Sequence, residues 1–366
     1  MPRSRALCPP NELMNFLSQL VLQDGTDVIR AELDERPSDF SRDEFDQLVE
    51  LASTNHVIVR GLERYLLLMR DIGDDLRVGW AQEALRVEQA RITNAVCFLE
   101  DICTAFEEEH YEVTIIKSLD HWPDLGSDLD LYTNAVPEGV IRLMRKRFTA
   151  EIAPRSWGDR LACKWNFLIP GLPEAVEIHM GRLGQTGEQV GIASQLPERA
   201  RLAVMGERTF RVPSASDRLM ISTLQRMYRH FYFRLCDVVD SAALADAGAI
   251  DYSELHATAR NAGIWEGVAT YLVIVSDYVK KYRDSGLNLP SFVRASARFD
   301  GGDVYYGRGF LRIPIMPQSA SLYSSQLSEL IRRRDLESTA RLSLLPWLAT
   351  AAVVGQKITG SDKGIW

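Results

Sequence analysis

The chain has 366 residues, a formal net charge of −8 and a pI of about 5.4; hydrophobic residues make up 46% and charged residues 25%. These fractions are ordinary for a globular protein, and the length exceeds what one compact core usually holds, so we expect two or three domains. The acidic balance argues against binding to long nucleic acid, which depends on contacts between basic side chains and phosphate.

The cysteines and the apolar segments indicate a cytoplasmic protein. The five cysteines are widely scattered, no pair has the spacing of a zinc finger, and the six histidines form no cluster with them along the sequence. This usage is typical of reduced thiols in the cytosol. The N-terminus lacks the apolar segment of a signal peptide, and the longest apolar stretch, residues 342–354, is too short to span a bilayer. We therefore expect no membrane partner.

Residues 1–110 are expected to form an N-terminal helical region, because apolar side chains recur there at helical spacing. Ser41, followed by Glu44 three positions later, predicts the capped start of one helix. We identify no chemistry in this region. The helices expected after the first apolar stretch cover residues 41–69, with an end near Gly73, and residues 78–109.

Residues 111–213 are expected to form an α/β unit, since the apolar pattern changes there from helical to alternating. Pro137 near the start of PEGVIRLMRKRF predicts a helix over residues 137–148. The Gly-rich, polar residues 181–198 are expected to form a loop. The expected strands are residues 112–117, 129–133, 160–168 and 174–180.

Residues 214–366 are expected to form a C-terminal helical domain. Its segment at residues 284–320 is expected to be irregular or to form short strands, because prolines and paired glycines interrupt the pattern there. Ser216 is expected to cap the first helix of this domain. The fold class that follows is α+β, with a small mixed sheet flanked by helical regions. The other helices expected here cover residues 233–247, 252–262, 265–282 and 321–341.

The sequence DLDLYT places two carboxylates on one face of an expected strand. Alternation along the strand directs Asp128 and Asp130 to the same side, and the leucines that follow them to the core. Glu177 lies between β-branched residues in the expected strand AVEIHM, where a charged side chain is costly unless it is paired or bound to a metal. Three carboxylates from adjacent strands suit two Mg2+ ions bound to the phosphates of a nucleotide.

A phosphate-binding turn is expected directly before the acidic pair. The first strand ends in Lys117-Ser118, and Ser118 lies ten positions before Asp128. Backbone N–H groups and a hydroxyl at such a turn can hold a triphosphate. We therefore expect Lys117 and Ser118 to contact the phosphates.

This pattern resembles the nucleotidyltransferase superfamily typified by DNA polymerase β, and more closely its branch of uncharacterised nucleotidyltransferases. In that branch the first strand ends Leu-Lys-Gly, the acidic pair reads Asp-Ile-Asp-Leu, a later strand reads Asp-Leu-His, and a helical segment carries His, Arg-Leu and Asp. The resemblance covers roughly residues 111–282. The corresponding residues here are Ile116-Lys117-Ser118, Asp128-Leu129-Asp130-Leu131, Glu177-Ile178-His179, His230, Arg234-Leu235 and Asp240.

The chain departs from the family pattern at three places. The family often has an arginine shortly before the acidic pair, a contact for the triphosphate, whereas this chain has Leu125-Gly126-Ser127. Ser118 stands where the branch has glycine, and Glu177 where it has aspartate. A lysine, Lys117 or Lys164, is expected to take over part of the phosphate binding.

The resemblance implies metal-dependent transfer of a nucleoside monophosphate from a nucleoside triphosphate, ATP or CTP, to a small-molecule or protein acceptor, with release of pyrophosphate. Two Mg2+ ions, or Mn2+, are the implied cofactors. Asp128, Asp130 and Glu177 are the implied catalytic and metal-binding residues. The expected nucleotide contacts are Lys117, Ser118, Ser127, His179, His230, Arg234 and Asp240.

Several alternatives stay open. Glu177 also fits a salt-bridged carboxylate of a strand, and His179 also fits a residue that orients Glu177 or is simply satisfied behind the site. His230, Arg234 and Asp240 also fit a buried ion-pair network that holds helices together. The enzyme could be toxin-like and act on tRNA. The protein could also be a catalytically inactive nucleotide-binding or scaffold protein.

Overall fold

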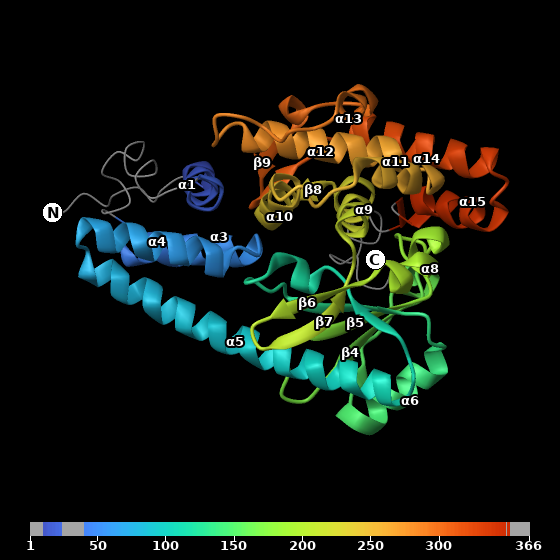
Figure 1. Cartoon of the computed structure of the whole chain (residues 1–366), viewed down its shortest axis with the longest axis horizontal. Coiled ribbons are helices and arrows are strands. Elements are labelled where there is room, and N and C mark those ends of the chain that lie inside the picture. Colours follow the sequence, from blue (N-terminus) through green and yellow to red (C-terminus); the bar gives the residue numbers. More distant parts are fainter. Residues whose placement is uncertain (1–9, 24–39, 349, 352–366) are drawn as a thin grey trace.

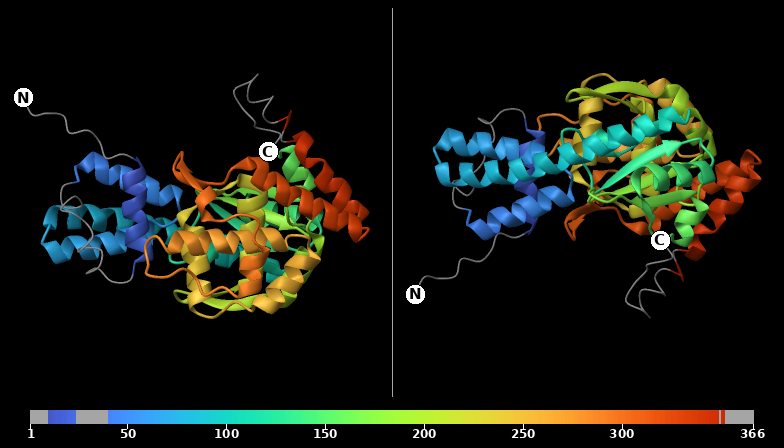
Figure 2. Two further views of the ribbon diagram at one scale, coloured as in Figure 1. Left: turned by 90° about the horizontal axis from the view of Figure 1, so that it is seen from above. Right: turned by 90° about the horizontal axis from the view of Figure 1, so that it is seen from below.

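A computed structural model of the protein describes residues 10–23, 40–348 and 350–351. In it, a mixed five-stranded sheet lies between helices that precede it and helices that follow it in the chain, which confirms the expected α+β class. The N-terminal helices lie at one end of the molecule and the last C-terminal helices at the other, as both views in Figure 2 show. None of the helices in the described part of the chain is long and apolar enough to cross a membrane.

The N-terminal helices confirm the predicted caps but not the predicted helix lengths. Ser41 and Glu44 form the capping box, and Gly73, with a φ of 73°, ends a helix as expected. The helix expected over residues 41–69 is in fact two helices. The helices of this region are α1 (Pro10–Leu22), α3 (Arg42–Thr54), α4 (Ile58–Ile72) and α5 (Asp75–Glu108).

The break between α3 and α4 has a local cause. The side chain of Asn55 donates to the carbonyls of Leu51 and Gly309, both at 3.0 Å, and accepts the backbone N–H of Leu235 at 3.0 Å. Side-chain bonds of this kind compete with helical backbone bonds. The next residue, His56, has a φ of 53°, which ends the helical path.

Helix α5 connects the N-terminal helices to the sheet. Its 34 residues span about 51 Å at 1.5 Å per residue. Figure 1 shows it running from the N-terminal end of the molecule to the sheet and α6 (Pro137–Phe148). Arg91, on α5, donates to the carbonyls of Leu125 and Gly126 at 3.1 and 3.3 Å and pairs with Glu174. One arginine of α5 therefore holds the loop before the acidic pair.

The sheet has the order β1-β2-β5-β4-β3, in which only β2 and β5 are parallel. Leu129 and Leu131 lie beside Val176 and Ile178 across the parallel pair, and all four are fully buried. The opposite face of the same pair carries the acidic residues. The strands are β1 (Val113–Ile115), β2 (Asp128–Thr133), β3 (Glu151–Ile152), β4 (Lys164–Leu168) and β5 (Ala175–Met180).

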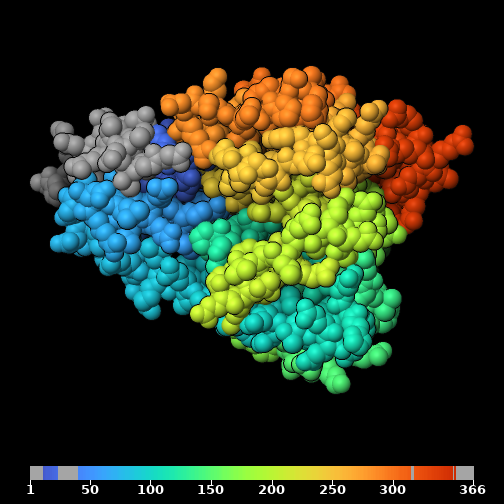
Figure 3. Space-filling view, in the orientation of Figure 1, coloured from blue at the N-terminus to red at the C-terminus, as the bar shows by residue number. Residues whose placement is uncertain are grey.

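Three elements around the sheet differ from the prediction. Helix α7 (Trp157–Leu161) takes the beginning of the strand expected over residues 160–168. Helix α8 (Val190–Arg199) replaces the end of the loop expected at 181–198, because Ile192, Ala193 and Leu196 bury one helical face there. A hairpin of β6 (Arg201–Met205) and β7 (Arg208–Val212) was not predicted. Figure 3 shows this segment, yellow-green, crossing the surface between the sheet and the C-terminal helices.

The C-terminal region lies over the face of β2 and β5 that carries the acidic residues, because residues within 225–234 line the same cavity. Ser214, not Ser216, caps the first helix of this region, and its hydroxyl accepts the N–H of Asp217 at 3.2 Å. A π-helical turn, η3 (Arg226–His230), follows α9. The helices of this region are α9 (Ala215–Gln225), α10 (Leu235–Asp246), α11 (Tyr252–Asn261), α12 (Trp265–Val279), α13 (Ser291–Ser296), α14 (Ala320–Arg332) and α15 (Leu336–Ser343).

The expected irregular segment 284–320 contains short strands. β9 (Tyr305–Gly307) and β10 (Phe310–Arg312) form a small sheet with β8 (Tyr232–Phe233), which takes the start of the helix expected at 233–247. The helix expected over residues 321–341 is divided into α14 and α15, because Arg334 has a φ of 61°. The residues after 351 lie outside the described part of the chain.

Candidate functional site

The three predicted metal ligands line one cavity of about 180 Å³. Asp130 and Glu177 are directly opposite each other in the parallel register of β2 and β5, and their side chains are both 13% exposed. Asp128 lies two residues earlier on the same face of β2, towards the mouth of the cavity, and is exposed. Oxygens of Asp130 and Glu177 and a ring nitrogen of His179 lie within 4.8 Å of one another.

Two lysines and a histidine surround the inner carboxylates. Lys117 pairs with Asp130 and lies 3.3 Å from Glu177 Oε1, while Lys164 Nζ lies 2.9 Å from Glu177 Oε2. His179 Nε2 lies 2.8 Å from Glu177 Oε1. Burial alone would raise the pKa of Glu177, but Lys117, His179 and Lys164 outweigh it and hold that pKa well below its usual value.

The pKa of the outer carboxylate, Asp128, is shifted in the opposite direction to that of Glu177. The walls of the cavity partly desolvate the Asp128 carboxyl although the residue is exposed at the surface, which raises its pKa, and the neighbouring charges of Asp130 and Glu177 raise it further. For Lys117, burial lowers the pKa, but Asp130 and Glu177 prevail and raise it. The ammonium of Lys117 is thus the internal counterion of the inner pair.

Lys117 lies in a strained turn. Its φ of 60° and ψ of −57° belong to the rare γ-turn with positive φ, which the N–H of Ser118 closes by donating to the Ile116 carbonyl at 2.6 Å. The hydroxyl of Ser118 accepts the N–H of Asp130 at 2.7 Å and donates to the Asp128 carbonyl at 3.2 Å. Ser118 therefore fastens the turn to the acidic strand, and its proton is directed at the strand.

The opposite wall of the cavity is basic and comes from η3 and the start of α10. Arg226 pairs with Asp237 at 2.7 Å, whereas Arg229 and Arg234 form no ion pair with any carboxylate among the described residues. Burial and the neighbouring arginines hold the pKa of His230 well below its usual value, so its ring is neutral. Unpaired guanidinium groups facing carboxylates across a cavity suit a ligand with several negative charges and bound cations.

The other predicted nucleotide contacts lie in different places. Ser127 lines the cavity next to Asp128. His179 lines a smaller adjoining cavity of about 40 Å³. Asp240 lies outside the lining: its carboxylate is 2.7 Å from Arg60 Nη1 and 2.5 Å from His121 Nδ1. Burial raises the pKa of Asp240, but Arg60 and His121 more than offset this and lower it. Asp240 is thus part of a buried ion-pair network.

Sequence reasoning missed four basic residues of the lining: Arg226, Arg229, His56 and His121. The two arginines had a signal, because RMYRH places basic residues in a buried aromatic segment and π-helical turns are frequent at functional sites. The two histidines had none, since they come from the α3–α4 turn and from the short helix η2 (Ser118–His121).

A larger cavity of about 610 Å³ lies elsewhere in the described structure, between α11, α12 and α14. Its lining includes Trp265 and three serines of α14, with Glu266 and Glu329, but none of the residues of β2 or β5. We assign the chemistry to the smaller cavity, because three carboxylates of two adjacent strands gather there opposite arginines that have no ion pair within the described part of the chain.

Comparison with models of known protein families finds no match for this chain, and comparison with curated protein sequences finds none either. The functional assignment therefore depends on the residues and their geometry.

Proposed function

We propose that the protein is a metal-dependent nucleotidyltransferase of the polymerase-β type. It would transfer a nucleoside monophosphate from ATP or CTP to a small-molecule or protein acceptor and release pyrophosphate. The observation that carries the proposal is the register of β2 and β5, which sets Asp130 opposite Glu177 with Asp128 on the same face. The arginines on the far wall of the same cavity support it.

The carboxylates fit divalent cations. Asp128, Asp130 and Glu177 offer hard oxygen donors of the kind that Mg2+ and Mn2+ prefer. The pKa of Asp128 is raised by desolvation and by the charges of Asp130 and Glu177, and a bound cation would offset this repulsion among the carboxylates. When bound, the metal ions would stabilise the charge that develops on the phosphates.

The side chains of the chain would then orient and activate the reactants. Arg229 and Arg234 would bind the β- and γ-phosphates, which places the α-phosphorus near the carboxylates. A new P–O bond forms to the acceptor, and the bond to pyrophosphate breaks with its electron pair. The acceptor proton passes to a carboxylate, and Asp128, whose pKa is raised, is suited to take it.

Lys117 would change partners during binding. The ammonium of Lys117 pairs with the two inner carboxylates. Two divalent cations bound to those carboxylates would repel this ammonium. The phosphates offer it a new negative partner in the same cavity.

Labelled triphosphates test the proposal. The protein is incubated with each α-labelled nucleoside triphosphate and a cell extract depleted of nucleotides, with Mg2+ or Mn2+, and pyrophosphate and labelled acceptor are measured. We expect Asp130→Asn and Glu177→Gln to lower the rate by at least about 100-fold. Asp46→Asn, at an exposed carboxylate of α3, is the control and should keep full activity. Activity that survives in Asp130→Asn would contradict the proposal.

The same assay separates the alternatives. Label that appears on tRNA changes the class of acceptor but retains the transfer chemistry. Binding of a triphosphate without pyrophosphate release would instead indicate an inactive nucleotide-binding protein, and absence of binding a scaffold.

A further inference from the structure

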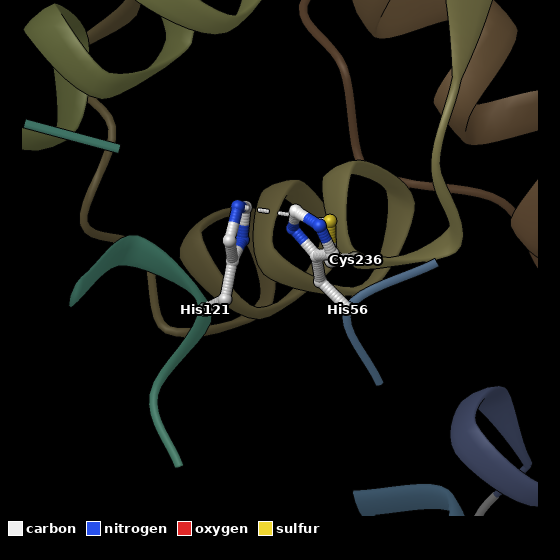
Figure 4. A group of neighbouring side chains, drawn as sticks. All are labelled: His56, His121 and Cys236. Carbon is white, nitrogen blue, oxygen red and sulfur yellow. Dashed lines mark hydrogen bonds between the residues drawn. The ribbon is translucent and has the colours of Figure 1, made fainter. Parts of the chain in front are cut away.

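A second group of potential ligands lies beside the acidic site and includes none of its carboxylates. His56, His121 and Cys236 face one another, as Figure 4 shows, and one ligand atom from each lies within 4.8 Å of the others. They come from the α3–α4 turn, from η2 and from α10. The histidines are 8% exposed and the cysteine is fully buried.

The spacing suits a tetrahedral metal ion. Zinc binds imidazole nitrogen at about 2.0–2.1 Å and thiolate sulfur at about 2.3 Å, so neighbouring ligand atoms are about 3.5 Å apart in a tetrahedron. Cys236 Sγ lies 3.7 Å from His121 Nε2. The remaining separations, up to 4.8 Å, require only a small inward movement of His56.

Asp240 supplies an independent observation. Its carboxylate accepts from His121 Nδ1 at 2.5 Å, which leaves the Nε2 lone pair directed at Cys236. Histidines that bind metals usually donate their other ring N–H to a carboxylate in this way, and the carboxylate fixes the tautomer and the ring orientation. The Cys236 thiolate would add one negative charge to the ligand set, since the carboxylate of Asp240 is already paired with Arg60.

We propose that His56, His121 and Cys236 bind one zinc ion, with Asp240 as the positioning residue of His121. The fourth position opens to the cavity of about 180 Å³, which both histidines line, so water or a bound ligand can complete the tetrahedron. This inference goes beyond the proposed function and does not depend on it. The imidazole and thiolate ligands of the proposed zinc site are borderline or soft, whereas Mg2+ prefers the oxygen ligands of the acidic site.

A catalytic thiol explains the same residues less well. Cys236, His121 and Asp240 have the order of a nucleophile, a base and an orienting acid. However, Cys236 is fully buried and does not line the cavity, so no substrate reaches its sulfur. A small metal ion can enter from the cavity, because two of its three ligands, His56 and His121, lie at the cavity wall.

The zinc site would join three parts of the chain. The α3–α4 turn belongs to the N-terminal helices, η2 to the segment before the acidic strand, and α10 to the C-terminal region. A ligand that binds only the folded state raises stability in proportion to the logarithm of its concentration over Kd. Zinc should therefore raise the Tm of the full chain.

The test uses the full chain, stripped of metal with a chelator and titrated with Zn2+ or with Co2+ as a spectroscopic probe. We expect one Zn2+ per chain, and for Co2+ a sulfur-to-cobalt charge-transfer band with the strong visible bands of tetrahedral coordination. Cys236→Ser should abolish the charge-transfer band, and Asp240→Asn should weaken Zn2+ binding about 10- to 100-fold. His56→Asn, which suits the φ of 53° at this position, should also weaken binding and serves if Cys236→Ser fails to fold.

Two control variants make the result specific. Cys103→Ser alters another free, half-buried cysteine and should leave the spectrum unchanged. Glu177→Gln should remove transfer activity and leave Zn2+ binding intact, which separates failure of this site from failure of the proposed function. Zinc binding that is unchanged in both Cys236→Ser and His56→Asn, or a Co2+ spectrum without the charge-transfer band, would overturn the inference.

Discussion

Replacement of Arg60 by methionine should destabilise the protein strongly. Arg60 belongs to α4, and its side chain is 18% exposed. Its Nε lies 2.6 Å from Asp124 Oδ2 and its Nη1 2.7 Å from Asp240 Oδ1. Asp124 is fully buried. Methionine keeps most of the apolar volume, so the substitution mainly removes the charge.

The expected loss in the free energy of unfolding follows from Asp124 and Asp240, the carboxylates that lose Arg60 as their partner. Removing one partner of a buried ion pair costs about 3–5 kcal/mol, because the other charge is left buried without compensation. Here Asp124 keeps the N–H of Val59 at 2.6 Å, and Asp240 keeps His121. Because these bonds remain in the variant, we expect a loss at the lower end of this range, about 3 kcal/mol in the free energy of unfolding.

The pH dependence of the loss has a definite sign. Burial already raises the pKa of Asp124 against the effect of Arg60, and Arg60 is the largest favourable charge that lowers the pKa of Asp240. In Arg60→Met both folded-state pKa values rise. A carboxyl with a raised folded-state pKa destabilises the folded protein above that pKa, and protonation relieves the cost. The difference in the free energy of unfolding between Arg60→Met and the unsubstituted protein should therefore shrink as the pH falls.

Urea unfolding followed by circular dichroism measures the effect. Arg42→Met is the matched control, because Arg42 pairs with Asp46 on the surface, with side chains 56% and 54% exposed, and exposed pairs contribute little. The double variant Arg60→Met/Asp124→Asn should recover part of the loss, since it removes one stranded charge. The reasoning is refuted if Arg60→Met and Arg42→Met unfold at the same urea concentration.

Two further predictions concern buried hydroxyl groups. Tyr65→Phe should leave the free energy of unfolding unchanged or raise it, because the buried Tyr65 hydroxyl has no hydrogen-bond partner among the residues that the structure describes. Tyr271→Phe should cost about 1–2 kcal/mol, because it breaks a 2.8 Å bond to Ser241; equal Tm values for the two variants would contradict this. Ser118→Ala should cost about 1–3 kcal/mol, because the buried N–H of Asp130 loses its acceptor, and an unchanged urea midpoint would show that the turn does not depend on this hydroxyl.

The parts of the fold that follow from local sequence were predictable. Alternation in DLDLYT and AVEIHM places Asp130 and Glu177 on one face of their strands, and the structure has them opposite each other. Ser41 and Glu44 form their capping box within four residues. These features depend on neighbours in the chain, so a pattern in the sequence reports them.

The parts that depend on distant contacts were not predictable. The break after α3 follows from bonds between Asn55 and residues 180 and 254 positions away. His121 and Cys236 are 115 positions apart and meet only after the C-terminal helices pack. Arg229 belongs to a π-helical turn whose basic residues are visible in the sequence, but nothing local in RMYRH shows that the turn faces the acidic strands. The spacing of residues along the chain does not predict such long-range contacts.

The course of α5 sets a practical limit on how far the protein can be shortened. A fragment that starts at Tyr111 keeps every acidic residue of the cavity yet lacks Arg91, which fastens the loop ahead of Asp128 and neutralises Glu174. It also lacks Arg60 and His56. Such a fragment would form its strands with an unsupported loop and uncompensated carboxylates, so screens for inhibitors or acceptors need the long helix and the two helices before it.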